Sequence, residues 1–305
     1  MALPECCPLC SSDRSSQTAV TAHVYGGKEG QAFFRCLECD ARYLHPGLTD
    51  EEESRFYAME FEGFMAGRAG TGGGWRNAEE HVEASETTRV RRMAYLEPVL
   101  PAQARVLEVG CSSGYMLYPL VAQGHHCVGV EPSGVFSDFV EERGVPVYPS
   151  VELMLQDGTH DGGFDLIMHF FVLEHVRNPV EFLKQQLDLL ASGGRLIFEV
   201  PNVADPLHSV YDIPAFERFY WSVAHAWYFS DRSLEHLLGR LNVDFEIRGD
   251  QRYDLSNHMV WARDGRPGGM GRFSGLLGQE LEDSYRSALV RSGHCDTLIC
   301  VAHAT

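Results

Sequence analysis

The chain has 305 residues and a formal net charge of −18 at pH 7, from 25 basic and 43 acidic side chains. This length allows one large domain and a small one, and 44% hydrophobic with 22% charged residues is typical of a globular protein. The acidic balance opposes phosphate binding, and the sequence contains neither a signal peptide nor a membrane-spanning apolar run, so we expect no nucleic-acid and no membrane partner.

The N-terminal segment, residues 1–48, carries two cysteine pairs at metal-ligand spacing. The four cysteines are Cys7, Cys10, Cys36 and Cys39. Strands are expected between the pairs, over residues 18–25 and 31–35. Four thiolates complete a tetrahedral site, so we predict a small zinc-ribbon domain whose structural Zn²⁺ supplies stability that so short a unit lacks. Free thiols or a lost site are the alternatives, and Cys6 is a weaker ligand candidate than Cys7.

The cysteine content also bears on the cellular compartment. The chain has nine cysteines and no recognisable secretory leader. This combination favours a reducing environment with metal ligation rather than disulfides. We therefore predict a cytoplasmic location.

Residues 49–104 are predicted to form a helical connector. Acidic residues follow Thr49, which is typical of a helix start. A glycine-rich stretch over 63–74 is expected to be a loop. Residues 78–100 are expected to form one helix, ended by a proline.

From Arg105 to residue 305, apolar runs alternate with helical patterns, which predicts a mostly parallel sheet with right-handed crossovers. The expected strands are 105–109, 126–131, 145–148, 164–170, 195–200, 243–249 and an antiparallel last strand over 297–302. The expected helices are 114–123, 134–143, 151–156, 178–190, 231–240 and 276–291, with a loop over 264–275.

Two carboxylates and a glycine turn mark the most informative part of this sheet. Glu108 lies in the first strand, Gly110 and Gly114 form the turn after it, and Glu131 ends the second strand. Open α/β sheets bind ligands at the carboxyl ends of parallel strands, and an acidic residue there can accept ribose hydroxyls. The G-x-x-x-G spacing differs from the dinucleotide fingerprint, and Glu108 would repel a pyrophosphate but suits an ammonium group. This layout favours S-adenosylmethionine as the cofactor.

Two further motifs extend the pattern. Residues 164–176 read FDLIMHFFVLEHV, and residues 192–202 read SGGRLIFEVPN. Together with the glycine turn they resemble, in order and spacing, the motifs of class I S-adenosylmethionine-dependent methyltransferases. The resemblance implies an α/β Rossmann-like sheet with an antiparallel last strand. It also implies a cofactor site made by Glu108, Gly110, Ser112, Gly114, Glu131, Pro132, Ser133, His169 and Phe170.

The resemblance places other residues near the site. In the family, helices before the glycine turn often cover the cofactor, which makes Tyr57 and Trp75 candidates for that role, with ordinary packing as the alternative. Methyl transfer is mainly a matter of alignment, and a hydroxyl acceptor requires a general base, for which histidine is suited by its pKa near neutrality. The candidate catalytic residues are His225, His169 and Tyr211. The alternatives are a structural role for His225, buried packing for His169 and an exposed loop position for Tyr211.

The segment His225-Ala226-Trp227-Tyr228-Phe229-Ser230 resembles an H-x-x-Y-F-S stretch found after the fifth strand in many methyltransferases. With the four-cysteine ribbon it is distantly similar to the deoxysugar C-methyltransferases. Those enzymes carry a Y-H-E-H stretch, whose positions here are Ser222, Val223, Ala224 and His225, so only the last histidine is kept. This departure argues against copying their chemistry onto this chain.

For the acceptor, the combination of ribbon and methyltransferase motifs resembles enzymes of sugar, glycan and natural-product biosynthesis. We therefore expect O-methylation of a small molecule, with His225 as general base. An aromatic-rich insert over 216–228 could stack on such an acceptor or pack in the core. The alternatives are C- or N-methylation of a natural-product intermediate, a binding or scaffold module that recruits a carrier protein, and methylation of a protein or RNA. A homo-oligomer is also possible.

Overall fold

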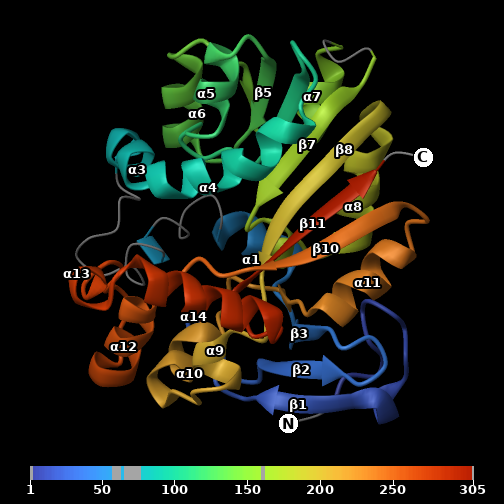
Figure 1. The fold of residues 1–305 in the computed structure, drawn as a ribbon. Helices are drawn as coiled ribbons and strands as arrows, with labels where there is room; N and C mark the ends of the chain where they lie inside the picture. Colours follow the sequence, from blue (N-terminus) through green and yellow to red (C-terminus); the bar gives the residue numbers. More distant parts are fainter. Residues whose placement is uncertain (1–2, 57–62, 65–76, 159–161, 304–305) are drawn as a thin grey trace. The chain divides into compact units, whose positions relative to one another are not determined.

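A computed structural model describes residues 3–56, 63–64, 77–158 and 162–303 of the chain (Figure 1). Tyr57, Trp75 and most of the glycine-rich 63–74 stretch lie outside the described residues, so their predicted roles stay predictions. No helix in the described part of the chain is long and apolar enough to cross a membrane.

The chain packs as two compact units, each assembled from separate stretches of sequence. The ribbon unit comprises Met1–Gly47, Leu173–Phe182 and Glu199–Cys300. The sheet unit comprises Leu48–Val172, Leu183–Phe198 and Val301–Thr305. These divisions differ from the sequence boundaries expected at residues 48 and 104, which remain a prediction about modules along the chain.

The main sheet has seven strands in the order β10-β11-β8-β7-β4-β5-β6 (Figure 1). The strands are β4 (Arg105–Val109), β5 (His126–Val130), β6 (Val147–Tyr148), β7 (Phe164–Phe170), β8 (Leu190–Pro201), β10 (Asp244–Asp250) and β11 (Thr297–His303). β4 lies parallel to both β5 and β7, and β5 lies parallel to β6. The sheet is mostly parallel with an antiparallel edge, which confirms the predicted Rossmann-like α/β fold.

The central strands are buried because their side chains are apolar on both faces, as is typical of parallel sheets. In β4, Val106 and Leu107 have no exposed surface. In β7, Ile167 and Met168 are equally buried. α5 (Leu117–Ala122) packs on β5, and both α6 (Gly134–Glu141) and α7 (Val151–Gln156) pack on β6 (Figure 1). These layers hold the carboxyl ends of β4 and β5 in a fixed relation.

The helical segment before β4 is divided where one helix was predicted. It consists of α3 (Ala78–Ala84), α4 (Glu86–Leu96) and a 3-10 turn, η4 (Glu97–Val99). The break falls at Ser85, whose φ of −90° and ψ of 0° depart from helical values. The expected helix start after Thr49 is confirmed in α1 (Asp50–Arg55), where Thr49 and Glu52 form a reciprocal capping box.

A four-stranded antiparallel sheet lies in the ribbon unit. It has the order β1-β2-β3-β9, with β1 (Gln17–Thr21), β2 (Ala32–Cys36), β3 (Arg42–His45) and β9 (Trp227–Tyr228). The first two strands were predicted and the last two were not. β9 pairs with β3 through Arg42 opposite Tyr228 and Tyr43 opposite Trp227. The ribbon sheet therefore incorporates a strand that lies about 180 residues after β3 in the sequence.

The rest of the ribbon unit is largely helical. After the 3-10 turn η5 (Leu173–His175) come α9 (Pro206–Ser209), α10 (Pro214–Tyr220), α11 (Asp231–Gly239), α12 (Leu255–Asp264), α13 (Ser274–Leu277) and α14 (Gln279–Arg291). α8 (Pro179–Asp188) follows η5 along the chain. α11 begins at a side-chain cap, in which Ser230 Oγ accepts the Ser233 N–H.

The aromatic insert packs as the core of this unit. The Trp221 and Tyr228 rings lie 4.7 Å apart, centroid to centroid, and each side chain is 1% exposed. Phe33 of β2 packs against both rings at 5.2 Å. These three rings are buried against one another and are not available to stack on a ligand.

Candidate functional site

The glycine turn after β4 approaches the end of β5 through the backbone. The N–H groups of Gly110 and Cys111 both donate to the Val130 carbonyl, at 2.8 and 3.1 Å. Gly110 has φ +74°, and a Cβ built there would lie 2.7 Å from Val172 Cγ2. Gly114 has φ +72°. The two glycines are thus required by backbone conformation, as the motif predicted.

Glu131 holds the turn in place. Its Oε2 accepts the Ser112 N–H at 2.8 Å, and its Oε1 accepts the Ser133 N–H at 2.9 Å. Ser112 is in the left-handed region with φ +48°, which the Glu131 bond helps to stabilise. Each carboxylate oxygen has a second lone pair, so Glu131 can accept further hydrogen bonds from a ligand. Pro132, the neighbour predicted to line the site, is exposed.

Glu108 is a buried carboxyl with unused hydrogen-bonding capacity. It is 2% exposed, and its Oε2 has no hydrogen-bond partner within the described residues. Burial raises the pKa of Glu108 well above its usual range, an effect that Arg92 opposes and Glu131 reinforces. The same turn holds a second buried polar atom in this condition, the Ser112 Oγ. Buried polar atoms in proteins are ordinarily hydrogen-bonded, and a bound polar ligand would supply the partners for these two oxygens.

Arg92 is a site residue that the sequence did not single out. It is 2% exposed, donates a hydrogen bond to the Tyr115 hydroxyl, and lies 3.8 Å from the Phe170 ring centroid. Its charge favours the ionised form of Glu108. The residue comes from α4, in a segment without a motif, so no local pattern could have indicated it.

His169 and Phe170, at the end of β7, are buried. His169 has no exposed surface and stacks on Phe198, with ring centroids 4.8 Å apart and an interplanar angle of 10°. Burial lowers the pKa of His169 to about 3, so the ring is neutral at physiological pH. Its catalytic role stays a prediction, and its burial against Phe198 favours a role in lining the site.

The other two catalytic candidates belong to the ribbon unit. His225 packs against His175 with ring centroids 4.8 Å apart, and Glu174 adjoins this pair. Tyr211 is 42% exposed, and its hydroxyl lies 2.7 Å from that of Tyr285. The structure thus brings His225 together with the Glu174-His175 motif, a contact the sequence did not reveal.

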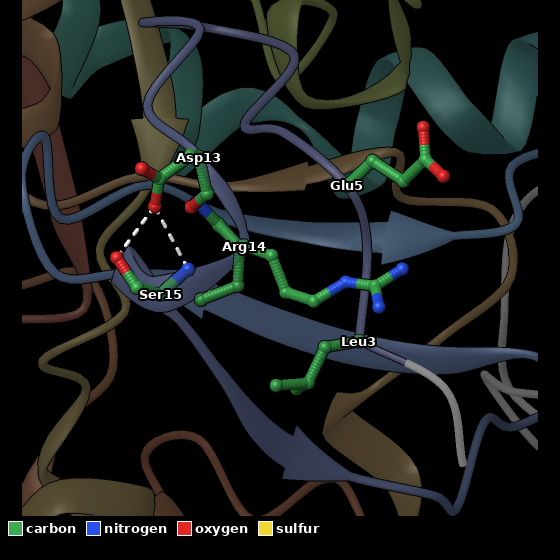
Figure 2. Close-up of a pocket in the computed structure, with 6 residues that line it drawn as sticks. Leu3, Glu5, Asp13, Arg14 and Ser15 are labelled. Atoms are coloured by element: carbon green, nitrogen blue, oxygen red, sulfur yellow. Dashed lines mark hydrogen bonds between the residues drawn. The ribbon is translucent and has the colours of Figure 1, made fainter.

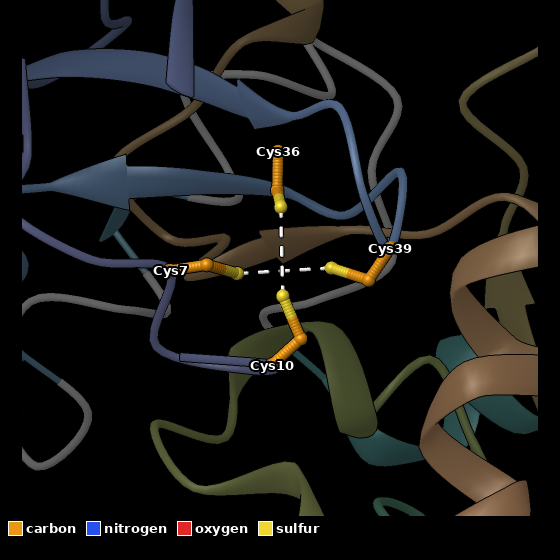
Figure 3. A group of neighbouring side chains, drawn as sticks. All are labelled: Cys7, Cys10, Cys36 and Cys39. Carbon is orange, nitrogen blue, oxygen red and sulfur yellow. Dashed lines mark hydrogen bonds between the residues drawn. The ribbon is translucent and has the colours of Figure 1, made fainter. Parts of the chain in front are cut away.

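The four predicted metal ligands converge (Figure 3). The sulfur atoms of Cys7, Cys10, Cys36 and Cys39 all lie within 4.8 Å of one another. Cys7 Sγ is 3.7 Å from Cys39 Sγ, and Cys10 Sγ is 3.6 Å from Cys36 Sγ. Figure 3 shows the four sulfur atoms pointing toward a common centre. The arrangement can hold one tetrahedral ion with no open coordination position.

A hollow of about 680 Å³ lies beside the ribbon (Figure 2). It is lined by Leu3, Glu5, Asp13, Arg14, Ser15 and Gln17. Asp13 Oδ1 accepts both the N–H and the hydroxyl of Ser15, at 2.8 and 2.5 Å. These contacts shape the turn before β1 and converge on no reactive group.

Comparison with known proteins identifies the family. Residues 78–247 match the model of a methyltransferase domain, which is more than half of the chain. The chain belongs to the methyltransferase domain family. The matched segment contains the turn from Glu108 to Gly114, Glu131 and the β7 motif. This confirms the resemblance to class I S-adenosylmethionine-dependent methyltransferases. It also confirms that the protein is an enzyme and that S-adenosylmethionine is its class of methyl donor.

Curated relatives of this methyltransferase share its sequence over part of their length. A tRNA U34 carboxymethyltransferase of Dichelobacter nodosus is 33% identical over 151 residues, which cover 47% of this chain and 46% of that protein. One of Pseudomonas fluorescens is 34% identical over 114 residues, covering 35% of each protein. The chain thus matches less than half the length of these relatives. A S-adenosylmethionine-dependent methyltransferase from Archaeoglobus fulgidus has the same fold, with a TM-score of 0.50 and 17% identity over 80% of this chain and 99% of that one.

These relatives correct two predictions made from the sequence. The expected small-molecule acceptor and the expected absence of a nucleic-acid partner are both wrong, because the curated relatives are tRNA-modifying enzymes. The net charge averages the whole chain, whereas RNA binding depends on the local arrangement of basic groups, so the acidic balance was not sufficient ground to exclude a nucleic-acid partner. The finer resemblance to deoxysugar C-methyltransferases stays a prediction and is not carried forward.

Proposed function

We propose that this methyltransferase modifies a nucleotide of tRNA, with S-adenosylmethionine as donor. The observation that carries the proposal is the 33–34% identity to tRNA U34 carboxymethyltransferases. The donor site described above supports the first half of the reaction. The acceptor is inferred from the relatives.

The residues at the donor site fit the proposed cofactor. Glu108 and Ser112 each offer a buried oxygen that has no hydrogen-bond partner among the described residues. Glu108 suits the ammonium end of the methionine moiety, and the carboxylate oxygens of Glu131 suit ribose hydroxyls. The bound donor would supply an electrophilic methyl group on a sulfonium. The protein's contribution is to orient that group and exclude water.

A second candidate differs in the group transferred. The curated relatives are named carboxymethyltransferases, and a carboxymethyl donor carries a carboxylate beside its sulfonium. Arg92 is a buried guanidinium at the donor site and is suited to bind such a carboxylate. This observation favours carboxymethyl transfer as the alternative to methyl transfer.

Tyr211 and His169 remain candidates for contact with the reacting groups. Tyr211 is exposed on the ribbon unit, and its hydroxyl can exchange its Tyr285 partner for an acceptor atom. His169 is buried and neutral, which supports a role in shaping the site rather than in taking a proton. His225 was predicted to be the general base for O-methylation of a small molecule, and we do not propose that role for a tRNA acceptor.

We also propose a structural zinc ion in the ribbon. A tetrahedral site with Zn–S bonds of about 2.3 Å has sulfur atoms about 3.8 Å apart. The distances of 3.7 Å for Cys7 to Cys39 and 3.6 Å for Cys10 to Cys36 agree with that geometry.

A tRNA acceptor accords with the cytoplasmic location predicted from sequence.

The test of the proposed function is a transfer assay. Zinc-replete protein is incubated at low salt with S-adenosylmethionine, or with its carboxylated analogue, and tRNA from a strain lacking U34 modifications. Nucleosides are then resolved by mass spectrometry. We expect a nucleoside that carries the added group, absent with Glu131→Gln and present with Glu142→Gln, whose carboxyl is exposed. The proposal fails if protein that binds S-adenosylhomocysteine leaves every tRNA nucleoside unchanged.

A further inference from the structure

A second cluster of metal-ligating side chains lies in the ribbon unit, apart from the four cysteines. Glu174, His175 and His225 each offer a ligand atom, and these atoms lie within 4.8 Å of one another. Glu174 and His175 belong to η5, and His225 comes just before β9. The fold therefore brings together two imidazoles and a carboxylate from segments 50 residues apart.

The ring of His175 is oriented as a metal ligand would be. Its Nδ1–H donates to the Ala224 carbonyl at 2.6 Å. That bond fixes the tautomer and leaves Nε2 with its lone pair, and metal-binding histidines usually donate their other ring nitrogen in this way. His175 Nε2 lies 4.0 Å from Glu174 Oε1, which is too long for a hydrogen bond. Two ligands of one ion can be this far apart.

Glu174 supplies a buried carboxyl group. It is 1% exposed, and its Oε2 has no hydrogen-bond partner among the described residues. A second buried carboxyl, Glu199, adds to the negative potential, whereas Arg252 reduces it. Arg252 is itself engaged by Asp296 at 3.0 Å. A cation bound beside Glu174 would stabilise the ionised form of this carboxyl, which burial otherwise disfavours.

Access to the cluster is on the histidine side. The His175 side chain is 18% exposed, and His225 is partly exposed. A cation held by these three side chains would keep coordination positions that the protein does not fill. Water or an oxygen atom of a ligand can occupy such positions.

We propose that Glu174, His175 and His225 form a binding site for a divalent transition-metal cation. The two nitrogen donors and one oxygen donor suit Zn²⁺, Mn²⁺ or Fe²⁺ better than Ca²⁺. The open positions would let the cation bind a hydroxyl or phosphate oxygen and act on it as a Lewis acid. The inference concerns the ribbon unit alone and does not depend on the proposed acceptor.

The test measures metal stoichiometry and Mn²⁺ binding. The full chain is loaded with Zn²⁺, freed of excess by gel filtration, and analysed for zinc per chain. Separately, protein with only its cysteine site filled is titrated with Mn²⁺, followed by loss of the free-ion paramagnetic resonance signal. We expect a second zinc per chain, and Mn²⁺ binding that Glu174→Gln and His225→Asn each weaken by more than about tenfold.

Controls separate this site from the others. His208→Asn alters a histidine of the same unit that pairs with Glu217, and it should leave both readouts unchanged. Cys36→Ser should remove the cysteine-bound zinc only. S-adenosylhomocysteine binding by the Glu174 and His225 variants checks that the protein is folded and that the donor site is intact. The proposal is overturned if wild-type protein takes up neither a second zinc nor Mn²⁺, or if the two variants bind as wild type does.

Discussion

The substitution Gly110→Ala tests whether the turn after β4 depends on glycine for both conformation and space. The backbone has φ +74°, where an L-residue costs about 1–2 kcal/mol. The new Cβ would also lie 2.7 Å from Val172 Cγ2, and such overpacking costs about 1–3 kcal/mol. We expect Gly110→Ala to lower the free energy of unfolding by about 2–5 kcal/mol and to weaken S-adenosylhomocysteine binding more than about tenfold.

Gly124→Ala is the matched control. Gly124 has φ +90°, but a Cβ there meets no heavy atom within 4 Å. It should therefore show the conformational cost of about 1–2 kcal/mol without the steric cost, and leave ligand binding intact. In the double variant, Val172→Ala should relieve the contact and give a favourable coupling of about 1–2 kcal/mol with Gly110→Ala.

Urea unfolding followed by circular dichroism gives the stabilities, and calorimetric titration gives the affinities. If Gly110→Ala and Gly124→Ala are equally destabilised and bind equally well, the steric argument is refuted. A double-mutant cycle without coupling would likewise show that Val172 does not limit the space at Gly110.

Three further predictions concern the metal, the cofactor and pH. Cys36→Ser should abolish zinc in the ribbon and lower the Tm, as seen by elemental analysis and calorimetry, and retention of zinc would contradict the four-cysteine site. Glu131→Gln replaces an acceptor oxygen by a donor that faces a backbone N–H, so it should weaken S-adenosylhomocysteine binding more than about tenfold, with Glu142→Gln unaffected. Burial raises the pKa of Asp205 from 3.8 to about 7, so this carboxyl costs stability progressively as pH rises from about 4 to 7. Asp205→Asn keeps an acceptor oxygen for the α9 cap, and its free energy of unfolding relative to wild type should rise over that pH range by at most about 4 kcal/mol. If the urea midpoints of variant and wild type differ by the same amount at pH 5 and at pH 8, the argument is wrong.

The central strands of the sheet unit and the donor site could be predicted because the patterns that indicate them lie within short stretches of sequence. β4 and β7 were located to the residue, since each is a mainly apolar run that belongs to a recognised motif. The glycine turn comes directly after β4, and Glu131 comes directly after β5. Arg92 was missed because it reaches the site from α4, in a segment without a motif, through the tertiary fold.

The ribbon unit could be predicted only in part. The spacing of the four cysteines indicated the metal site, but β3 and β9 are short strands, and β9 forms only through its pairing with β3. Their pairing depends on residues far apart in sequence, which periodicity cannot detect. In the same way Glu174 lies in the β7 motif and His225 in a separate segment, and only the fold shows that they share a cluster.

The pairing of β3 with β9 has a consequence for how the chain folds during synthesis. His45 leaves the ribosome about 180 residues before Trp227, roughly 10–40 s at ordinary translation rates. Through that interval β3 presents an unpaired edge, which is prone to non-native pairing with other chains. A metal ion captured early by the two cysteine pairs would hold the nascent hairpin together until its last strand arrives. Zinc supply during translation would then affect the yield of native protein as well as the stability of the finished molecule.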